Sequence, residues 1–207
     1  MEYSGKGILD AENKNIYIIM NKPVGYVCSA VSDSHKTVYQ LLSPELQLLV
    51  KGAKRGHRLH TVGRLDSDTS GLLIFTTDGQ FSHYFTSPEN NIEKTYEVEL
   101  RDSVEYELQK EYIQYVKEGV ILPADKKAAE EKAGSGKLEF LDTYKCRITI
   151  TEGKFHQVRR TSLAAGNYVE KLKRLSIGSL QLPSETELPA GTYREMTTEE
   201  INLLYKR

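Results

Sequence analysis

The chain has 207 residues, of which 39% are hydrophobic and 28% charged, and its formal net charge is −1. This length and apolar content suffice for one sizeable core, so we expect one domain, and the near-neutral charge identifies no partner by itself. Only two cysteines occur, Cys28 and Cys146, without metal-ligand spacing, which argues against a zinc site or a disulfide scaffold and fits a reducing compartment.

Membrane insertion and secretion are not expected. No apolar run approaches the roughly 18 residues that indicate a membrane span, and the N-terminal stretch MEYSGKGILDAENKN is polar. We therefore expect a cytoplasmic protein without a signal peptide or transmembrane helix. Residues 1–14 are polar and include two glycines, so they predict a flexible segment ahead of a folded domain over residues 15–207.

The first half of the chain predicts short strands and helices around one polar loop. Apolar or alternating runs predict strands at Asn15–Met20, Tyr26–Ala30, Leu72–Thr77 and Glu93–Leu100. Helical patterns lie at Val38–Leu42, Pro44–Val50 and Gln80–Thr86. Ser43 and Asp78 directly precede two of these helices and are suited to cap them. The alternation after Glu93 places Tyr96 on the inward face of its strand.

The second half continues in the same way. Strands are predicted at Val120–Leu122, Leu138–Leu141, Tyr144–Thr151, Tyr168–Glu170, Leu172–Ile177 and Leu180–Leu182. Helices are predicted at Ser103–Lys117, Phe155–Ala165 and Thr198–Tyr205. Pro123–Lys137, a charged stretch with glycines, predicts a mobile loop. Because strands outnumber helices and many are joined by short links, we predict the α+β class with a largely antiparallel sheet.

The stretch Gly63–Gly71 (GRLDSDTSG) contains the strongest candidates for catalytic side chains. Asp66 and Asp68 follow Arg64 in a loop that feeds a buried strand. Such a loop can hold Asp66 rigidly where a nucleophile is needed. The alternative is a turn with two solvated acids.

Two basic segments predict a face that binds a polyanion. Lys51–Arg64 carries five Lys or Arg, two His and no acid, and Lys154–Arg174 carries six Lys or Arg against Glu170. At helical spacing His156, Arg159 and Arg160 fall on one side. The candidate RNA-binding residues are Lys54, Arg55, Arg58, Arg64, Lys154, His156, Gln157 and Arg160. The alternative for both segments is ordinary solvated surface.

Five ordered blocks carry a family resemblance. They are NKPVGYVCS at Asn21–Ser29, GRLDSDTSGLLIFTTDG at Gly63–Gly79, KTYEV at Lys94–Val98, EGKFHQVRR at Glu152–Arg160, and RLSIGSLQL with LPAGTYREMT within Arg174–Thr197. Together they resemble the bacterial ribosomal pseudouridine synthases of the RsuA type over nearly the whole chain. The resemblance implies a mixed, mostly antiparallel sheet with flanking helices and two lobes around a central catalytic cleft.

The resemblance also implies roles for single residues. Asp66 matches the catalytic aspartate of the family, and Tyr96 matches the tyrosine that packs against the target base. Arg159 matches the basic residue that pairs with the aspartate. Arg64 matches an arginine that fills space in the RNA when the base leaves. These residues suit base flipping, which costs a few kcal/mol and needs an aromatic surface for the extruded base.

The implied activity is isomerisation of uridine to pseudouridine in structured ribosomal RNA or a ribosomal assembly intermediate, by a monomer. The blocks favour the small-subunit (16S) RNA, with the large-subunit (23S) RNA as the alternative. No electrons or external atoms are transferred, so we expect no cofactor and no metal. Asp66 attacks the ribose, attacks the base, or abstracts a proton to give a glycal, and the sequence leaves these routes open.

The chain departs from the family pattern at two places, and two other functions also fit parts of the sequence. Many family members begin with a small RNA-binding domain, for which this chain has no room before Asn15, and Thr161–Ala165 replaces the usual methionine-containing pattern. One rival is an inactive RNA-binding or ribosome-assembly module. The other is a magnesium-dependent phosphatase, suggested by Asp66-Ser67-Asp68-Thr69, although Ser70 and the lack of a preceding apolar strand fit it poorly.

Overall fold

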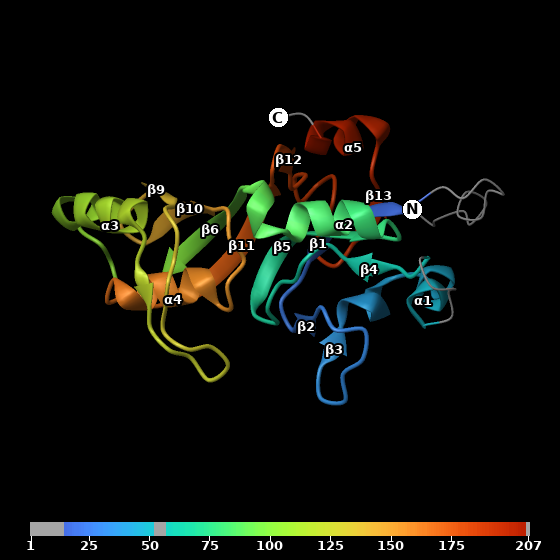
Figure 1. The fold of residues 1–207 in the computed structure, drawn as a ribbon, viewed down its shortest axis with the longest axis horizontal. Coiled ribbons are helices and arrows are strands. Elements are labelled where there is room, and N and C mark those ends of the chain that lie inside the picture. The colour runs from blue at the N-terminus through green and yellow to red at the C-terminus, as the bar shows by residue number, and fades with distance from the viewer. Residues whose placement is uncertain (1–14, 52–56, 206–207) are drawn as a thin grey trace.

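One nine-stranded sheet organises the computed structural model, which describes residues 15–51 and 57–205 (Figure 1). Its strands are β1 (Tyr17–Lys22), β4 (His60–Thr61), β5 (Thr69–Thr76), β6 (Lys94–Leu100), β9 (Lys137–Phe140), β10 (Lys145–Ile150), β11 (Val169–Ile177), β12 (Leu180–Gln181) and β13 (Tyr193–Glu195). The main order is β13-β1-β5-β11-β6-β10-β9, with β4 on β5 and β12 on β11.

Helices flank this sheet, and two small ribbons complete the fold. The helices are α1 (Pro44–Lys51), α2 (Gly79–Thr86), α3 (Tyr106–Glu118), α4 (Gln157–Ala164) and α5 (Thr198–Tyr205), with 3-10 turns η1 (Val38–Leu41) and η2 (Pro88–Asn90). The ribbons pair β2 (Tyr26–Val27) with β3 (Lys36–Thr37) and β7 (Ile121–Leu122) with β8 (Glu131–Lys132). In Figure 1, α3 and α4 accompany one end of the sheet, and α1, α2 and α5 the other.

The predicted fold class is confirmed. Every pairing in the large sheet is antiparallel except that of β5 with β11. The predicted division into two lobes around a cleft stays a prediction. None of the helices within residues 15–51 and 57–205 is long and apolar enough to cross a membrane.

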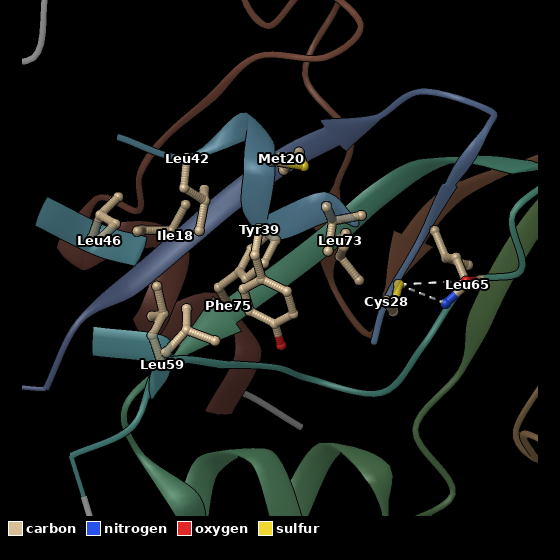
Figure 2. Packing of buried hydrophobic residues seen from close by; sticks show 12 residues of the cluster. Ile18, Met20, Cys28, Tyr39, Leu42, Leu46, Leu59, Leu65, Leu73 and Phe75 are labelled. Atoms are coloured by element: carbon tan, nitrogen blue, oxygen red, sulfur yellow. Dashed lines mark hydrogen bonds between the residues drawn. The ribbon is translucent and has the colours of Figure 1, made fainter. Parts of the chain in front are cut away.

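The core lies on both faces of the sheet. On one face, Ile18 and Met20 of β1 and Leu73 and Phe75 of β5 pack under η1 and α1, in what we call the first core cluster (Figure 2). The alternate residues of the same strands face α2 and α5 in a second cluster. Strands buried on both faces have continuous apolar sequences, which is why LLIFT in β5 shows no alternation of apolar and polar residues. A third cluster joins β6, β10 and β11 to α4 through Val158.

The parallel contact between β5 and β11 depends on Gly71. Gly71 pairs with Arg174 and has φ +101°, and a Cβ added to it would lie 2.2 Å from the Arg174 carbonyl oxygen. Lys22 pairs with Gly71 on one side, and Arg174 pairs with Tyr96 on the other. Lys22, Gly71, Arg174 and Tyr96 therefore form one row across four neighbouring strands.

Several predicted boundaries differ from the structure for physical reasons. The strands predicted at 168–170 and 172–177 are one strand, β11, which absorbs two register shifts against β6. The helix predicted from Phe155 begins at Gln157, because His156 is in the left-handed conformation. The loop predicted to be mobile contains β8 and is tied to α4, because Glu131 forms ion pairs with Lys154 and Arg160. The predicted flexible segment 1–14 lies outside the described residues.

Gly71→Ala is expected to destabilise the fold by about 1–3 kcal/mol, because the new methyl group meets backbone that cannot move aside and the positive φ adds strain. Gly79→Ala is the matched control, since nothing lies within 4 Å of its added Cβ. Urea denaturation of both variants measures the difference. Equal stability of Gly71→Ala and wild type would show that β5 and β11 do not approach this closely.

Candidate active site

A buried lysine fixes the backbone of the loop that carries Asp66. Lys22 ends β1 and is fully buried, and its Nζ donates to the carbonyl oxygens of Thr69 at 2.7 Å, Asp66 at 3.0 Å and Pro23 at 3.1 Å. These contacts use all three donors of an ammonium group. Burial lowers the pKa of Lys22, and the nearby carboxylates of Asp66 and Asp68 oppose that shift.

Further contacts hold the same loop from the β2 side. The Leu65 N–H donates to Cys28 Sγ at 3.3 Å, and the thiol lies 3.4 Å from the Leu65 carbonyl oxygen (Figure 2). The Gly25 N–H donates to the Ser67 carbonyl oxygen at 2.6 Å. Burial raises the pKa of the Cys28 thiol, so it keeps its proton and can donate. The backbone is fixed, while the Asp66 carboxylate remains 41% exposed and open to a substrate.

His156 is the side chain whose ring the structure places beside Asp66. Its Nε2 lies 3.6 Å from Asp66 Oδ1, and its Nδ1 lies 2.7 Å from Asp125 Oδ2. The imidazole also stacks on the Phe155 ring, with 3.8 Å between centroids. The sequence placed His156 among RNA-binding residues, whereas its contacts put it at the candidate active site.

The predicted ion pair between Arg159 and Asp66 is not what the structure shows. The Arg159 guanidinium lies 3.0 Å from Asp68 Oδ2 and donates to the carbonyl oxygens of Val169 at 3.1 Å and Asp68 at 3.4 Å. The physical reason is the left-handed His156, which occupies the position next to Asp66. The Arg159 Nε is buried and has no hydrogen-bond partner among the described residues.

Tyr96 of β6 lies between two parts of the core. It is partly buried and packs against the first core cluster, which contains Leu65, and against the third cluster, which contains Val158. Leu65 precedes Asp66, and Val158 precedes Arg159. The inward orientation predicted for Tyr96 is therefore confirmed.

Two predicted RNA-binding residues are structural instead. Arg160 is 2% exposed, pairs with Glu131 at 2.9 Å, and donates to backbone oxygens of Ala129, Pro123, Phe155 and Leu122. Gln157 is also buried, and it bonds to Glu152 and to the Lys154 N–H. The structure contradicts the predicted role of both, because a helix that starts at Gln157 turns this side inward.

The other predicted RNA-binding residues have varied surroundings. Arg58 and Arg64 are exposed, as predicted. Lys154 is partly buried and ion-paired with Glu131 at 2.9 Å, which raises its pKa. Lys54 and Arg55 lie outside the described residues. Their binding of RNA stays a prediction.

Lys22 and Asp125 belong to the candidate site, although they are not among the site residues expected from the sequence. Lys22 had a readable signal, since a lysine two residues after the apolar NIYIIM run and directly before a proline lies at the end of a strand buried on both faces. Asp125 had none, because one acid in a polar loop looks like any other.

Known proteins resemble this chain over most of its length. A family model described as RNA pseudouridylate synthase matches residues 16–164. This chain belongs to that family. The resemblance inferred from the five sequence blocks is thereby confirmed, and the family assignment favours an isomerase over a phosphatase.

Among the relatives, the ribosomal small subunit pseudouridine synthase A of Haemophilus influenzae is 41% identical over 190 residues, covering 92% of this chain and 74% of the relative. The protein of the same description from Pasteurella multocida is 40% identical over 185 residues, covering 89% and 72%. A solved structure described as a pseudouridylate synthase superposes with a TM-score of 0.78 at 41% identity, covering 92% of this chain and 74% of that one.

In this pseudouridylate synthase family member, Arg160→Met is expected to cost on the order of 3 kcal/mol of folding free energy, because it removes one of the two cationic partners of Glu131 and leaves several buried carbonyl oxygens without a donor. Arg58→Met, at an exposed position, is expected to change stability by less than about 0.5 kcal/mol. Chemical denaturation compares the two. A stable Arg160→Met with weakened RNA binding would restore the RNA-binding role and contradict the structural one.

Proposed function

We propose that this chain isomerises uridine to pseudouridine in the RNA of the small ribosomal subunit. The relatives at 40–41% identity carry that substrate in their descriptions. The observation that carries the proposal is Asp66, an accessible carboxylate on a loop whose backbone is anchored by the buried Lys22.

The reaction rearranges one nucleotide without gain or loss of atoms. The bond from N1 of uracil to the ribose C1′ breaks, the base rotates, and a bond from C5 to C1′ forms. One proton leaves C5 and N1 ends with one. Asp66 acts on the ribose, on the base, or on a ribose proton, and each route requires an ionised carboxylate within reach of the flipped nucleotide.

Substrate capture is assigned to residues around Asp66. Tyr96 stacks on the flipped uracil, a contact worth about 1–3 kcal/mol. Arg64, exposed two residues before Asp66, enters the space that the base leaves, and Arg58 contacts phosphates. We propose a structured ribosomal RNA or an assembly intermediate as the partner, and a monomer acting in the cytoplasm, where ribosomal RNA is processed.

Asp66→Asn is expected to lower the rate of pseudouridine formation to less than about 1% of wild type, because an amide fills the same volume but is not a nucleophile. Asp68→Asn, the same change two residues away, is expected to cause a far smaller loss. Single-turnover assays on small-subunit and large-subunit ribosomal RNA measure both the rate and the substrate. A fully active Asp66→Asn would overturn the assignment, and an inactive wild type would favour the RNA-binding module.

RNA binding is expected to weaken steeply with salt, because each phosphate contact releases counterions. Arg58→Ala and Arg64→Ala are each expected to reduce the slope of log affinity against log salt by slightly under about one unit. Arg101→Ala is the control, since Arg101 is ion-paired with Asp102 beyond the end of β6. Titrations at several salt concentrations measure the slopes, and an unchanged slope for both variants would place these arginines outside the RNA interface.

A further inference from the structure

His156 holds an unusual backbone conformation that its own helix does not require. It precedes α4 with φ +48° and ψ +31°, one of two non-glycine residues with positive φ in the described part of the chain. Such a conformation persists only where the surroundings enforce it. As the N-cap residue, His156 makes no side-chain capping bond. Its imidazole is therefore directed to other partners, the two carboxylates of Asp125 and Asp66.

The two ring nitrogens of His156 have distinct partners. Nδ1 lies 2.7 Å from Asp125 Oδ2, which is a short hydrogen bond, and Nε2 lies 3.6 Å from Asp66 Oδ1. The hydrogen bond with His156 is the main cause that lowers the pKa of Asp125, so Asp125 is ionised at neutral pH. An ionised carboxylate only accepts hydrogen bonds, so the shared proton belongs to Nδ1. Nε2 is then the nitrogen left to exchange a proton with Asp66.

Asp125 is itself held in place. Its second carboxylate oxygen accepts from the Lys126 N–H, and its backbone pairs with that of Ala128 in both directions. The segment that follows is fixed on α4, because Arg160 binds both Glu131 and the Ala129 carbonyl oxygen. Asp125 and His156 thus belong to two segments that these contacts join.

We propose that Asp125 is a positioning residue of the isomerase site, which acts on Asp66 through His156. This inference rests on the proposed function and deepens it. Asp125 keeps a proton on Nδ1 and aims Nε2 at Asp66. The imidazole can then donate a proton to Asp66 when it is charged and accept one when it is neutral, in a reaction that moves one proton from C5 to N1.

Other charged groups lie around His156 and its two carboxylate partners, and they also influence how the reaction rate depends on pH. They are Arg159 and Arg160 on α4, Asp68 on the Asp66 loop, Glu131 and Lys154 beside Arg160, and the buried Lys22. Arg160 also acts on Asp125 through its charge. None of these groups bonds to an imidazole nitrogen, so the contacts of Asp125 and Asp66 decide where the ring protons lie.

The first test needs no variant and no RNA. Long-range proton–nitrogen NMR spectra of the ¹⁵N-histidine-labelled wild type are expected to show the neutral His156 ring with its proton on Nδ1. The chain has five histidines, so His156→Gln identifies the signal. A neutral ring with its proton on Nε2 would overturn the proposal, whether or not the protein proves to be an isomerase.

The second test uses Asp125→Asn, whose amide can donate to Nδ1 and so favour the other tautomer. The single-turnover rate on small-subunit ribosomal RNA is expected to fall about tenfold or more, with a changed pH profile and unchanged RNA affinity. Asp125→Glu, which restores a carboxylate, is expected to recover part of the rate. Glu130→Gln removes a charge from an exposed position of the same loop and is expected to behave as wild type.

The outcomes separate the two proposals. A wild type that forms no pseudouridine defeats the proposed function, while the NMR spectrum still decides the geometry. An active wild type with an Asp125→Asn variant of equal rate and pH profile defeats the positioning role alone, and so does an equal loss in Glu130→Gln. If Asp125→Asn does not fold, the wild-type tautomer and the rate of Asp125→Glu decide.

Discussion

The buried ammonium of Lys22 is the constraint on which the site depends. A charge without solvent is costly unless all of its hydrogen bonds are made, and here they go to three backbone oxygens around the Asp66 loop. The same residue pairs with Gly71, which allows Arg174 to approach, and Arg174 pairs with Tyr96. One row of the sheet therefore sets the relative position of the loop and the aromatic ring.

Basic side chains are also buried in this row and partly buried next to it. Burial lowers the pKa of Lys94 to about 8, with the neighbouring Arg174 as the second cause, and Arg174 itself is 3% exposed. Lys22 bonds to the Asp66 loop, Arg174 lies in the same row of the sheet, and Lys94 lies two residues before Tyr96 on β6. A charge within a low dielectric is weakly screened, so these basic side chains favour an approaching phosphate.

Local patterns predicted most elements of the fold, and tertiary contacts explain the rest. The alternation of β6, the Asp78 cap of α2 and the Asp66 loop follow from neighbouring residues, and the structure confirms them. The sequence does not show which of two adjacent arginines is buried, because that depends on the left-handed His156. It predicted mobility after Pro123 from a charged composition, although Glu131 of that stretch forms ion pairs with Arg160 on α4 and with Lys154 just before it. Lys22 was missed because lysines are seldom fully buried.

The contacts between α4 and the Asp66 loop are weaker than the contacts that hold each of these two segments in its own place. His156 meets Asp66, and Arg159 meets Asp68, across 91 residues of sequence in the second case. The carboxylates are 41% and 61% exposed, and pairs of this kind contribute roughly 0–1 kcal/mol each. Arg160 and Lys22, by contrast, make several buried bonds. A nucleotide entering beside Asp66 can therefore displace the contact of Arg159 with Asp68 without disturbing the two segments that present the catalytic groups.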